Sequence, residues 1–259
     1  MYTLITGTTS GIGKEFANLF AKKGYNLVII AMNEEELKKQ KEELENKYNI
    51  SVKYIVKDLS IEESYSEIYN EVKQSNIEID ILINNAGFAT YGNFINVELE
   101  KQNNLAMVNM MAVMNLSYLF GKDMAKRKKG RIVNIASIAS FQAGPFMGMY
   151  YASKAFVRSF SEALHEELKE QGVIVTAICP GPTKTKFEER AKMKKSYMFK
   201  KMKVDTAKDV AEKSYKAMMK NKAVYVVGFH NKLITFLTRF GSLKLSRNVA
   251  KKINIGNAK

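Results

Sequence analysis

Short apolar runs alternate along the chain with longer charged segments, and this alternation predicts strands separated by helices. Several runs are apolar at nearly every position, as in Leu27-Val28-Ile29-Ile30, which is typical of parallel strands covered on both faces. Strands are expected at 2–6, 26–31, 52–56, 79–84, 131–137 and 173–179, with a weaker one at 223–227. Helices are expected at about 11–23, 34–47, 61–75, 98–121, 149–171 and 206–219. This order predicts an α/β fold with a doubly wound parallel sheet, in one domain over residues 1–259.

The composition narrows the class of protein. With 46% hydrophobic and 26% charged residues in 259, the chain is ordinary for a globular domain. Cys179 is the single cysteine, which excludes an internal disulfide, and together with two histidines it offers no metal-binding cluster, so we expect no metal. The sequence has neither a long uncharged apolar stretch nor a charged leader before Leu4, and it therefore predicts a cytoplasmic protein.

The net charge of +15 is concentrated at one end of the chain. Residues 1–183 hold 20 basic and 21 acidic side chains, whereas residues 184–259 hold 21 and 5. The basic excess is therefore an addition to a nearly neutral domain. Nucleic acid is not expected as a partner, because no nucleic-acid-binding motif accompanies the charge.

A glycine-rich turn joins the first expected strand to the first expected helix. It reads Thr6-Gly7-Thr8-Thr9-Ser10-Gly11-Ile12-Gly13. Glycines at this place let the backbone approach a pyrophosphate, and the helix N-terminus directs free N–H groups at the anion. The position of the turn, more than the glycines alone, predicts a Rossmann-type dinucleotide site.

The end of the second strand bears on the choice of cofactor. NAD-binding sheets commonly place an acidic residue there to hold the ribose hydroxyls. Here the strand ends Ala31-Met32-Asn33, without that acid, which favours NADP(H) over NAD(H). No arginine follows, and Asn33, Lys38 and Lys39 are the candidates for contact with the additional phosphate.

A tyrosine and a lysine four residues apart form the candidate catalytic pair. Because lysine is abundant, this spacing occurs four times, at Tyr69/Lys73, Tyr118/Lys122, Tyr150/Lys154 and Tyr197/Lys201. Only Tyr150 follows a strand that ends in serine, at Ser137 thirteen residues earlier. We therefore expect Ser137, Tyr150 and Lys154 at the carboxyl edge of the sheet, and prefer Tyr150 to the adjacent Tyr151.

These three residue types suit the reduction of a carbonyl. Hydride from a nicotinamide must be accompanied by a proton for the developing alkoxide, and a tyrosine with a pKa of about 10 is poorly matched to neutral pH. A lysine ammonium beside Tyr150, together with the positive nicotinamide, is expected to lower the tyrosine pKa. The Ser137 hydroxyl is expected to orient the carbonyl oxygen.

Five motifs occur in the order and spacing of the short-chain dehydrogenase/reductase superfamily, which the chain resembles over about residues 2–187. They are Thr6-Gly7-x3-Gly11-x-Gly13, Asn84-Asn85-Ala86-Gly87, Ser137, Tyr150-x3-Lys154 and Cys179-Pro180-Gly181-Pro182. The resemblance implies a catalytic tetrad in which Asn109 joins Ser137, Tyr150 and Lys154 by holding a water that relays protons to the lysine. Met32 departs from the family, where many NADP(H)-dependent members carry arginine.

The resemblance also implies where the cofactor binds. Asn85, Ala86 and Gly87 are expected near the adenosine, Asp58 at the adenine, and the segment from Pro180 to Thr185 at the nicotinamide. The complete set of expected cofactor-binding residues is Gly7, Thr9, Ser10, Gly11, Ile12, Gly13, Asn33, Asp58, Leu59, Asn85, Ala86, Gly87, Tyr150, Lys154, Pro180, Gly181, Thr183 and Thr185.

Residues 184–204 resemble the family's substrate lid. The apolar residues expected on the inner face of this helical lid are Phe187, Met193, Met198, Phe199 and Met202. Such a face suits an apolar substrate, with an anionic handle such as an acyl thioester, because methionine side chains adapt to irregular shapes. The alternative is an amphipathic helix that simply packs on the domain.

The basic C-terminal extension, about residues 230–259, is expected to form an amphipathic helix. Its apolar residues are Leu233, Ile234, Phe236, Leu237, Phe240, Leu243 and Leu245, and its basic residues are Lys232, Arg239, Lys244, Arg247, Lys251 and Lys252. This pattern is compatible with an anionic membrane surface, with the lid or with a neighbouring subunit as its partner. Family members often form homodimers or homotetramers, and the resemblance implies the same here.

Together these features predict an NAD(P)(H)-dependent oxidoreductase that interconverts a carbonyl and an alcohol, with Tyr150 as general acid/base. A variant of this prediction is a ketoacyl- or steroid-type reductase at a membrane surface. The alternative from another class is a non-catalytic, nucleotide-binding redox sensor, which could dispense with the tetrad. An epimerase or dehydratase of the longer related fold would need a larger substrate domain than 259 residues leave room for.

Overall fold

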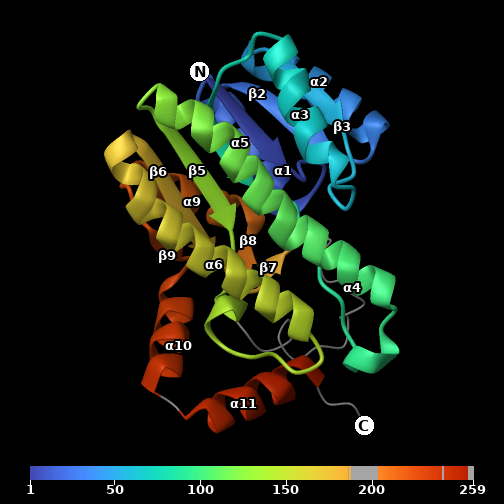
Figure 1. The fold of residues 1–259 in the computed structure, drawn as a ribbon, viewed down its shortest axis with the longest axis vertical. Coiled ribbons are helices and arrows are strands. Elements are labelled where there is room, and N and C mark those ends of the chain that lie inside the picture. Colours follow the sequence, from blue (N-terminus) through green and yellow to red (C-terminus); the bar gives the residue numbers. More distant parts are fainter. Residues whose placement is uncertain (186, 188–203, 241, 256–259) are drawn as a thin grey trace.

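A seven-stranded parallel sheet forms the centre of the computed structural model, which describes residues 1–185, 187, 204–240 and 242–255 (Figure 1). The sheet order is β3-β2-β1-β4-β5-β6-β9. The strands are β1 (Tyr2–Thr6), β2 (Asn26–Ala31), β3 (Val52–Val56), β4 (Ile79–Asn84), β5 (Gly130–Ile135), β6 (Val173–Cys179) and β9 (Val224–Val226). The order reverses between β1 and β4, which confirms the doubly wound α/β fold and places a ligand crevice at their carboxyl ends.

Helices cover both faces of the sheet (Figure 1). They are α1 (Gly11–Lys22), α2 (Glu34–Tyr48), α3 (Glu63–Gln74), α4 (Leu99–Ala106), α5 (Ala112–Lys126), α6 (Gly148–Leu168), α9 (Ala207–Met219), α10 (Phe229–Phe240) and α11 (Leu243–Ile255). Residues of α1, α2 and α9 share one buried cluster with the sheet, and residues of α3 and α5 share the other.

Strand β2 shows why the apolar runs lack a polar face. Leu27 and Ile29 belong to the cluster beneath α1, whereas Val28 and Ile30 belong to the cluster on the opposite face. All four side chains are fully buried, because successive residues of a strand point to opposite sides of a sheet that is covered on both.

Several element boundaries differ from those expected. Strand β5 ends at Ile135, and Ser137 instead begins a short 3-10 helix (Ile138–Phe141), since its hydroxyl accepts the N–H of Ala139. The expected helix over 98–121 consists of α4, a π-helical turn (Met107–Met111) and α5, which continues to Lys126. Helix α6 ends at Leu168, and residues 169–171 form a 3-10 turn.

The lid and the C-terminal extension leave the sheet at its carboxyl edge. Two short paired strands, β7 (Thr183–Lys184) and β8 (Asp205–Thr206), lie at the two ends of the expected lid, of which residues 186 and 188–203 are outside the described residues. The predicted inner-face residues Met193, Met198, Phe199 and Met202 fall among these. The extension forms two helices, α10 and α11, where one was expected. The Ser242 hydroxyl accepts the N–H of Leu245 and so caps the second of them. Among the described residues, no helix combines the length and apolar character that a bilayer span requires.

Candidate active site

Tyr150 lies in the first turn of α6, at the carboxyl edge of the sheet. The Ser137 hydroxyl hydrogen-bonds its phenol oxygen, and the Lys154 Nζ lies 5.9 Å from the centre of its ring. The fold thus brings together the three residues that the sequence separates by up to seventeen positions, with the phenol oxygen next to the serine.

Burial controls the protonation of Tyr150 and Lys154. It raises the pKa of Tyr150 to about 12, although the hydrogen bond from Ser137 lowers that pKa in part. Burial likewise lowers the pKa of Lys154 to about 8. The lowering of the tyrosine pKa that is expected from Lys154 and a positively charged nicotinamide together stays a prediction, because in the chain alone desolvation of the phenolate raises this pKa. At neutral pH the phenol is protonated and can donate its proton.

Lys154 is held in place by the end of β5 and by a glycine. Its Nζ donates to the carbonyl oxygen of Ile135 at 2.7 Å, and the side chain is 6% exposed. A Cβ on Gly87 would lie 3.5 Å from this Nζ and 3.0 Å from Oδ1 of Asn109. Gly87 therefore lets the backbone after β4 pass close to both side chains.

Asn109 occupies the π-helical turn between α4 and α5 and is fully buried. Its Nδ2 donates to the carbonyl oxygen of Phe88 and to Oγ of Ser153, both at 3.0 Å, and its Oδ1 accepts the N–H of Phe88 at 3.1 Å. Ser153 in turn donates to the carbonyl oxygen of Tyr150 at 2.8 Å. The side chain thus connects the loop after β4 to the helix that carries Tyr150 and Lys154.

Tyr151, the neighbouring tyrosine, is engaged elsewhere. Its hydroxyl donates to Oδ1 of Asn254 at 3.2 Å, and its ring packs against Gly144, where an added Cβ would lie 2.3 Å from the ring. This contact with the C-terminal helix α11 separates the roles of the two adjacent tyrosines, which the sequence alone leaves as competing candidates.

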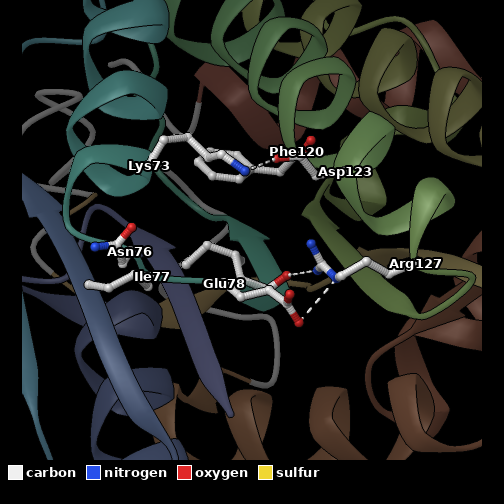
Figure 2. Close-up of a pocket in the computed structure, with 8 residues that line it drawn as sticks. Lys73, Asn76, Ile77, Glu78, Phe120, Asp123 and Arg127 are labelled. Atoms are coloured by element: carbon white, nitrogen blue, oxygen red, sulfur yellow. Dashed lines mark hydrogen bonds and ion pairs between the residues drawn. The ribbon is translucent and has the colours of Figure 1, made fainter.

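Of the remaining tyrosine–lysine pairs that the structure describes, Tyr69/Lys73 lies away from this edge, and Tyr118/Lys122 is exposed on α5. Tyr69 and Lys73 both bind Asp123, at 3.0 Å each, beside a hollow of about 240 Å³ between α3 and α5. Figure 2 shows two ion pairs among the side chains that line this hollow, Lys73 with Asp123 and Arg127 with Glu78. It borders the start of β4, at the amino edge, opposite to the side where such sheets bind ligands.

The glycine turn has the shape of a phosphate cradle. Gly7 and Gly11 have φ values of +70° and +57°, in the left-handed region that disfavours other residues. A Cβ on Gly13 would lie 2.2 Å from the carbonyl oxygen of Gly7, so the turn tolerates no side chain there. The Thr8 hydroxyl beside it is buried without a partner in the described structure. The turn therefore fits a pyrophosphate, with Thr9, Ser10 and Ile12 completing it.

The residues that follow β4 are hydrogen-bonded to the start of this turn. The Asn85 amide donates to the carbonyl oxygen of Thr6 at 2.9 Å, and the backbone N–H groups of Asn85 and Ala86 both donate to the Thr6 hydroxyl. On the other side, Thr185 covers the turn, because a Cβ on Gly11 would lie 3.0 Å from its Cγ2. Thr183 is tied to the carbonyl oxygen of Gly181 at 2.9 Å.

The expected adenosine contacts sit at the ends of β2 and β3. Asp58 accepts the N–H and the hydroxyl of Ser60, and Leu59 beside it is buried. Asn33 caps α2, since its Oδ1 accepts the N–H of Glu36. Lys38 forms an ion pair with Glu34 at 2.9 Å. The first turn of α2 thus carries three carboxylates, those of Glu34, Glu35 and Glu36.

A buried polar network behind the site was missed in the sequence. Asn84 Nδ2 donates to Oδ1 of Asn134 and to the Ser117 hydroxyl, and Asn134 Nδ2 donates to the Ser161 hydroxyl. These contacts join β4 and β5 to α5 and α6. The available signal was one asparagine in each of two adjacent apolar strands, Asn84 at the end of β4 and Asn134 one residue before the end of β5. No cluster of metal-ligating side chains occurs within the part of the chain that the structure describes.

Comparison with known proteins places these features in context. A family model described as short chain dehydrogenase matches residues 2–196. Very-long-chain 3-oxoacyl-CoA reductase of Rattus norvegicus is 33% identical over 184 residues, 69% of this chain and 58% of the relative. The 17-beta-hydroxysteroid dehydrogenase type 3 of Mus musculus is 35% identical over 182 residues, 69% of this chain and 59% of the relative. The chain thus spans about 60% of the length of these relatives.

Solved structures agree over more of the chain. A short-chain dehydrogenase from Sphingobium yanoikuyae in complex with NADPH has a TM-score of 0.82 at 28% identity, over 88% of each chain. An alcohol dehydrogenase specific for bulky-bulky ketones from Comamonas testosteroni has a TM-score of 0.78 at 27% identity, over 93% of this chain and 92% of that one.

Proposed function

Because the chain belongs to the short-chain dehydrogenase family, we propose that it is an NAD(P)(H)-dependent oxidoreductase that interconverts a carbonyl and an alcohol on an apolar or acyl-type substrate. The observation that carries this proposal is the placement of a protonated Tyr150 against Ser137 at the carboxyl edge of the sheet, with Lys154 one helical turn away.

Each side chain has a defined part in the reduction. The Ser137 hydroxyl orients the carbonyl oxygen, and the neutral Tyr150 phenol donates a proton to that oxygen as negative charge develops there. Lys154 stabilises the phenolate that remains, since its buried ammonium lies beside the ring. Asn109 acts as a positioning residue, because its hydrogen bonds hold the turn of α6 that bears Tyr150.

The cofactor site follows from the glycine cradle. Gly7, Gly11 and Gly13 would hold the pyrophosphate, Asp58 and Asn85 the adenosine side, and Gly181 and Thr185 the nicotinamide side. A bound nicotinamide cofactor supplies or accepts the hydride. The unpartnered Thr8 hydroxyl and the side-chain-free turn are features of this chain that support the assignment.

NADP(H) is proposed as the preferred cofactor over NAD(H). The absence of an acidic residue at Met32-Asn33 supports this choice, as does the NADPH named with the Sphingobium structure. The carboxylates in the first turn of α2 oppose it, because they repel a phosphate, although Lys38 neutralises Glu34. Parallel titration of NADPH and NADH, followed by nicotinamide fluorescence, tests the preference directly.

An apolar substrate is supported by the surroundings of Tyr150. The side chains that pack together around it are Ala89, Tyr91, Ala139, Met147, Tyr151 and Phe187. Phe187, the one described residue of the lid's expected inner face, has its ring 5.5 Å from that of Tyr150. The names of the relatives, a very-long-chain 3-oxoacyl-CoA reductase and a 17-beta-hydroxysteroid dehydrogenase, refer to very long acyl chains and to steroids, which agrees with this lining.

A panel of carbonyl compounds tests the proposed substrate class. The purified full chain is given NADPH with short polar ketones, bulky apolar ketones and 3-oxoacyl thioesters of increasing length, and loss of nicotinamide absorbance is followed. The kcat/KM should rise with apolar size, because each additional buried methylene contributes about 0.8 kcal/mol. Turnover confined to short polar ketones would contradict the proposal.

The redox-sensor alternative is not favoured, since a protein that only binds nucleotide has no need of Ser137, Tyr150 and Lys154 in this arrangement. A cytoplasmic location and a homodimer or homotetramer stay predictions. We also propose that the reductase works in contact with a membrane surface through its basic C-terminal helices.

A further inference from the structure

Helix α10 is folded with its polar side inward. Its buried positions are Asn231 and Thr235, which are 3% and 5% exposed. Its large apolar side chains, between 47% and 84% exposed, are Phe229, Leu233, Phe236, Leu237 and Phe240. A helix at the surface of a water-soluble domain normally shows the reverse pattern, with its apolar stripe toward the core.

Helix α11 repeats this inversion. The side chains at four-residue spacing that face the domain are Ser246, Ala250 and Asn254, the last two being fully buried. Leu243, Leu245 and Val249 are 81%, 59% and 46% exposed. The two helices together therefore present eight large apolar side chains to the surroundings. Grouped exposure of apolar side chains is typical of an interaction site. We call this set of residues on α10 and α11 the C-terminal face.

The charge of these helices indicates which class of partner fits the C-terminal face. Residues 229–255 contain six basic residues and no acidic ones. Lys232, Lys244, Arg247, Lys251 and Lys252 are exposed among the apolar side chains. A second copy of the chain would oppose like charges, and a nucleic acid would leave the phenylalanines and leucines in water. A bilayer with anionic headgroups satisfies both components, since it buries the apolar groups and neutralises the cations.

The polar sides of the same helices contact residues at the catalytic edge of the sheet. Asn254 accepts from the Tyr151 hydroxyl and donates to the carbonyl oxygen of Pro145 at 2.9 Å, and Ser246 donates to Gln142 at 2.9 Å. Asn231 packs so closely on the Pro180-Gly181 segment that a Cβ on Gly181 would lie 2.4 Å from its amide nitrogen. Figure 1 shows α10 and α11 beyond the carboxyl ends of the strands.

We propose that the C-terminal face docks the chain on an anionic lipid bilayer, so that the carboxyl edge with Tyr150 is turned toward the lipid. The docking proposal depends only on the described surface. The further idea, that docking delivers an apolar carbonyl compound from the bilayer to the site, rests on the function proposed above. A membrane-dissolved substrate would then reach the site with little exposure to water.

The absence of tryptophan from the chain allows a clean test of docking. Phe236→Trp places a single reporter on the C-terminal face, and Met219→Trp places a matched one at an exposed site at the end of α9. With vesicles of two parts phosphatidylcholine to one part phosphatidylserine, brominated acyl chains should quench the first reporter and not the second. Equal quenching of both reporters, or of neither, would overturn the proposal.

Sedimentation with the same vesicles separates the apolar and charged contributions. We expect Phe236→Ser combined with Leu237→Ser, and Lys251→Gln combined with Lys252→Gln, each to weaken partitioning at least tenfold. The control pair Lys220→Gln with Lys222→Gln, exposed between α9 and β9, should leave it unchanged. Equal binding to pure phosphatidylcholine, or a changed oligomeric state in place of vesicle binding, would refute lipid docking.

These readouts do not require turnover, so they separate docking from catalysis. If the chain reduces soluble ketones normally but does not bind vesicles, the docking proposal is wrong and the proposed function stands. If it binds vesicles but shows no reductase activity, the proposed function is wrong and the docking proposal stands. Thermal unfolding of each variant confirms that it is folded, which is expected because all the substituted side chains are exposed.

Discussion

The central sheet and the C-terminal face bury opposite kinds of side chain. In the sheet, Leu27 to Ile30 are all fully buried, and in α10 the apolar Leu237 is 58% exposed while Asn231 is 3% exposed. Both regions nevertheless consist of regular elements with good backbone hydrogen bonding. The difference lies in what each element packs against. The strands meet apolar helix faces, whereas Asn231 of α10 packs on Gly181 and Asn254 of α11 bonds the carbonyl oxygen of Pro145.

This contrast shows that an amphipathic pattern identifies a helix but does not say which of its faces is turned inward. Apolar content alone would place Phe236 and Leu237 in a core. The buried amides decide the orientation instead, because they need hydrogen-bond partners: Asn231 donates to the carbonyl oxygen of Val227 and packs on Gly181, and Asn254 bonds Tyr151 and Pro145. Phe236 and Leu237 are therefore left on the outside.

The largest effect is expected at the catalytic edge. Tyr150→Phe removes the proton donor and keeps the ring, so kcat for carbonyl reduction should fall about 10³-fold, within the range of general acid catalysis. Cofactor affinity, measured by nicotinamide fluorescence, should change little. Substantial residual turnover would show that another group donates the proton. Tyr151→Phe is the matched control and should retain most of kcat, because its hydroxyl is bound to Asn254.

A matched pair of leucines tests the burial contrast itself. Leu82→Ala empties a fully buried position in β4 and should cost about 2–5 kcal/mol of unfolding free energy. Leu237→Ala, at an exposed position of α10, should change it by no more than about 0.5 kcal/mol. Urea unfolding in the absence of lipid measures both. Similar losses for the two variants would mean that α10 is packed in solution.

The pH dependence of reduction tests burial of charge at the catalytic edge. Lys154, with its pKa lowered to about 8, is protonated below that value and neutral above it, while Tyr150, at about 12, keeps its proton throughout. The reduction rate should therefore fall as pH rises above 8, approaching tenfold per unit. Lys154→Arg should lack this fall, since arginine stays charged. A flat wild-type profile up to pH 10 would contradict the assignment.

The smallest expected effect concerns the three carboxylates in the first turn of α2, opposite in sign to the basic residues of the C-terminal face. Glu35→Gln removes one exposed carboxylate from the first turn of α2 and should lower the KM for NADPH about twofold, because exposed charges interact weakly across water. The KM for NADH should stay the same. Equal changes for both cofactors would indicate that this turn does not face the 2′-phosphate.

Much of the fold could be predicted because apolar runs and glycine turns act locally. The run 26–31 matches β2 at both ends, since a doubly covered strand admits few polar residues. Boundaries set by side-chain capping were less accessible: Ser137 was expected to close β5, but its hydroxyl starts a 3-10 turn two residues beyond the strand. The π-helical turn around Asn109 also has no local signal, because it depends on contacts with Phe88 and Ser153.

The order of residues along the chain was enough to establish the strand–helix alternation, the glycine turn and the register of serine, tyrosine and lysine. These features depend on periodicity and spacing, which can be read from the sequence without knowledge of the fold. The protonation of Tyr150, the engagement of Tyr151 by Asn254 and the outward direction of the phenylalanines in α10 were decided only in three dimensions. Each of these three features depends on desolvation or on a partner that is distant in the chain. Desolvation and distant contacts arise only when the helices and strands pack together.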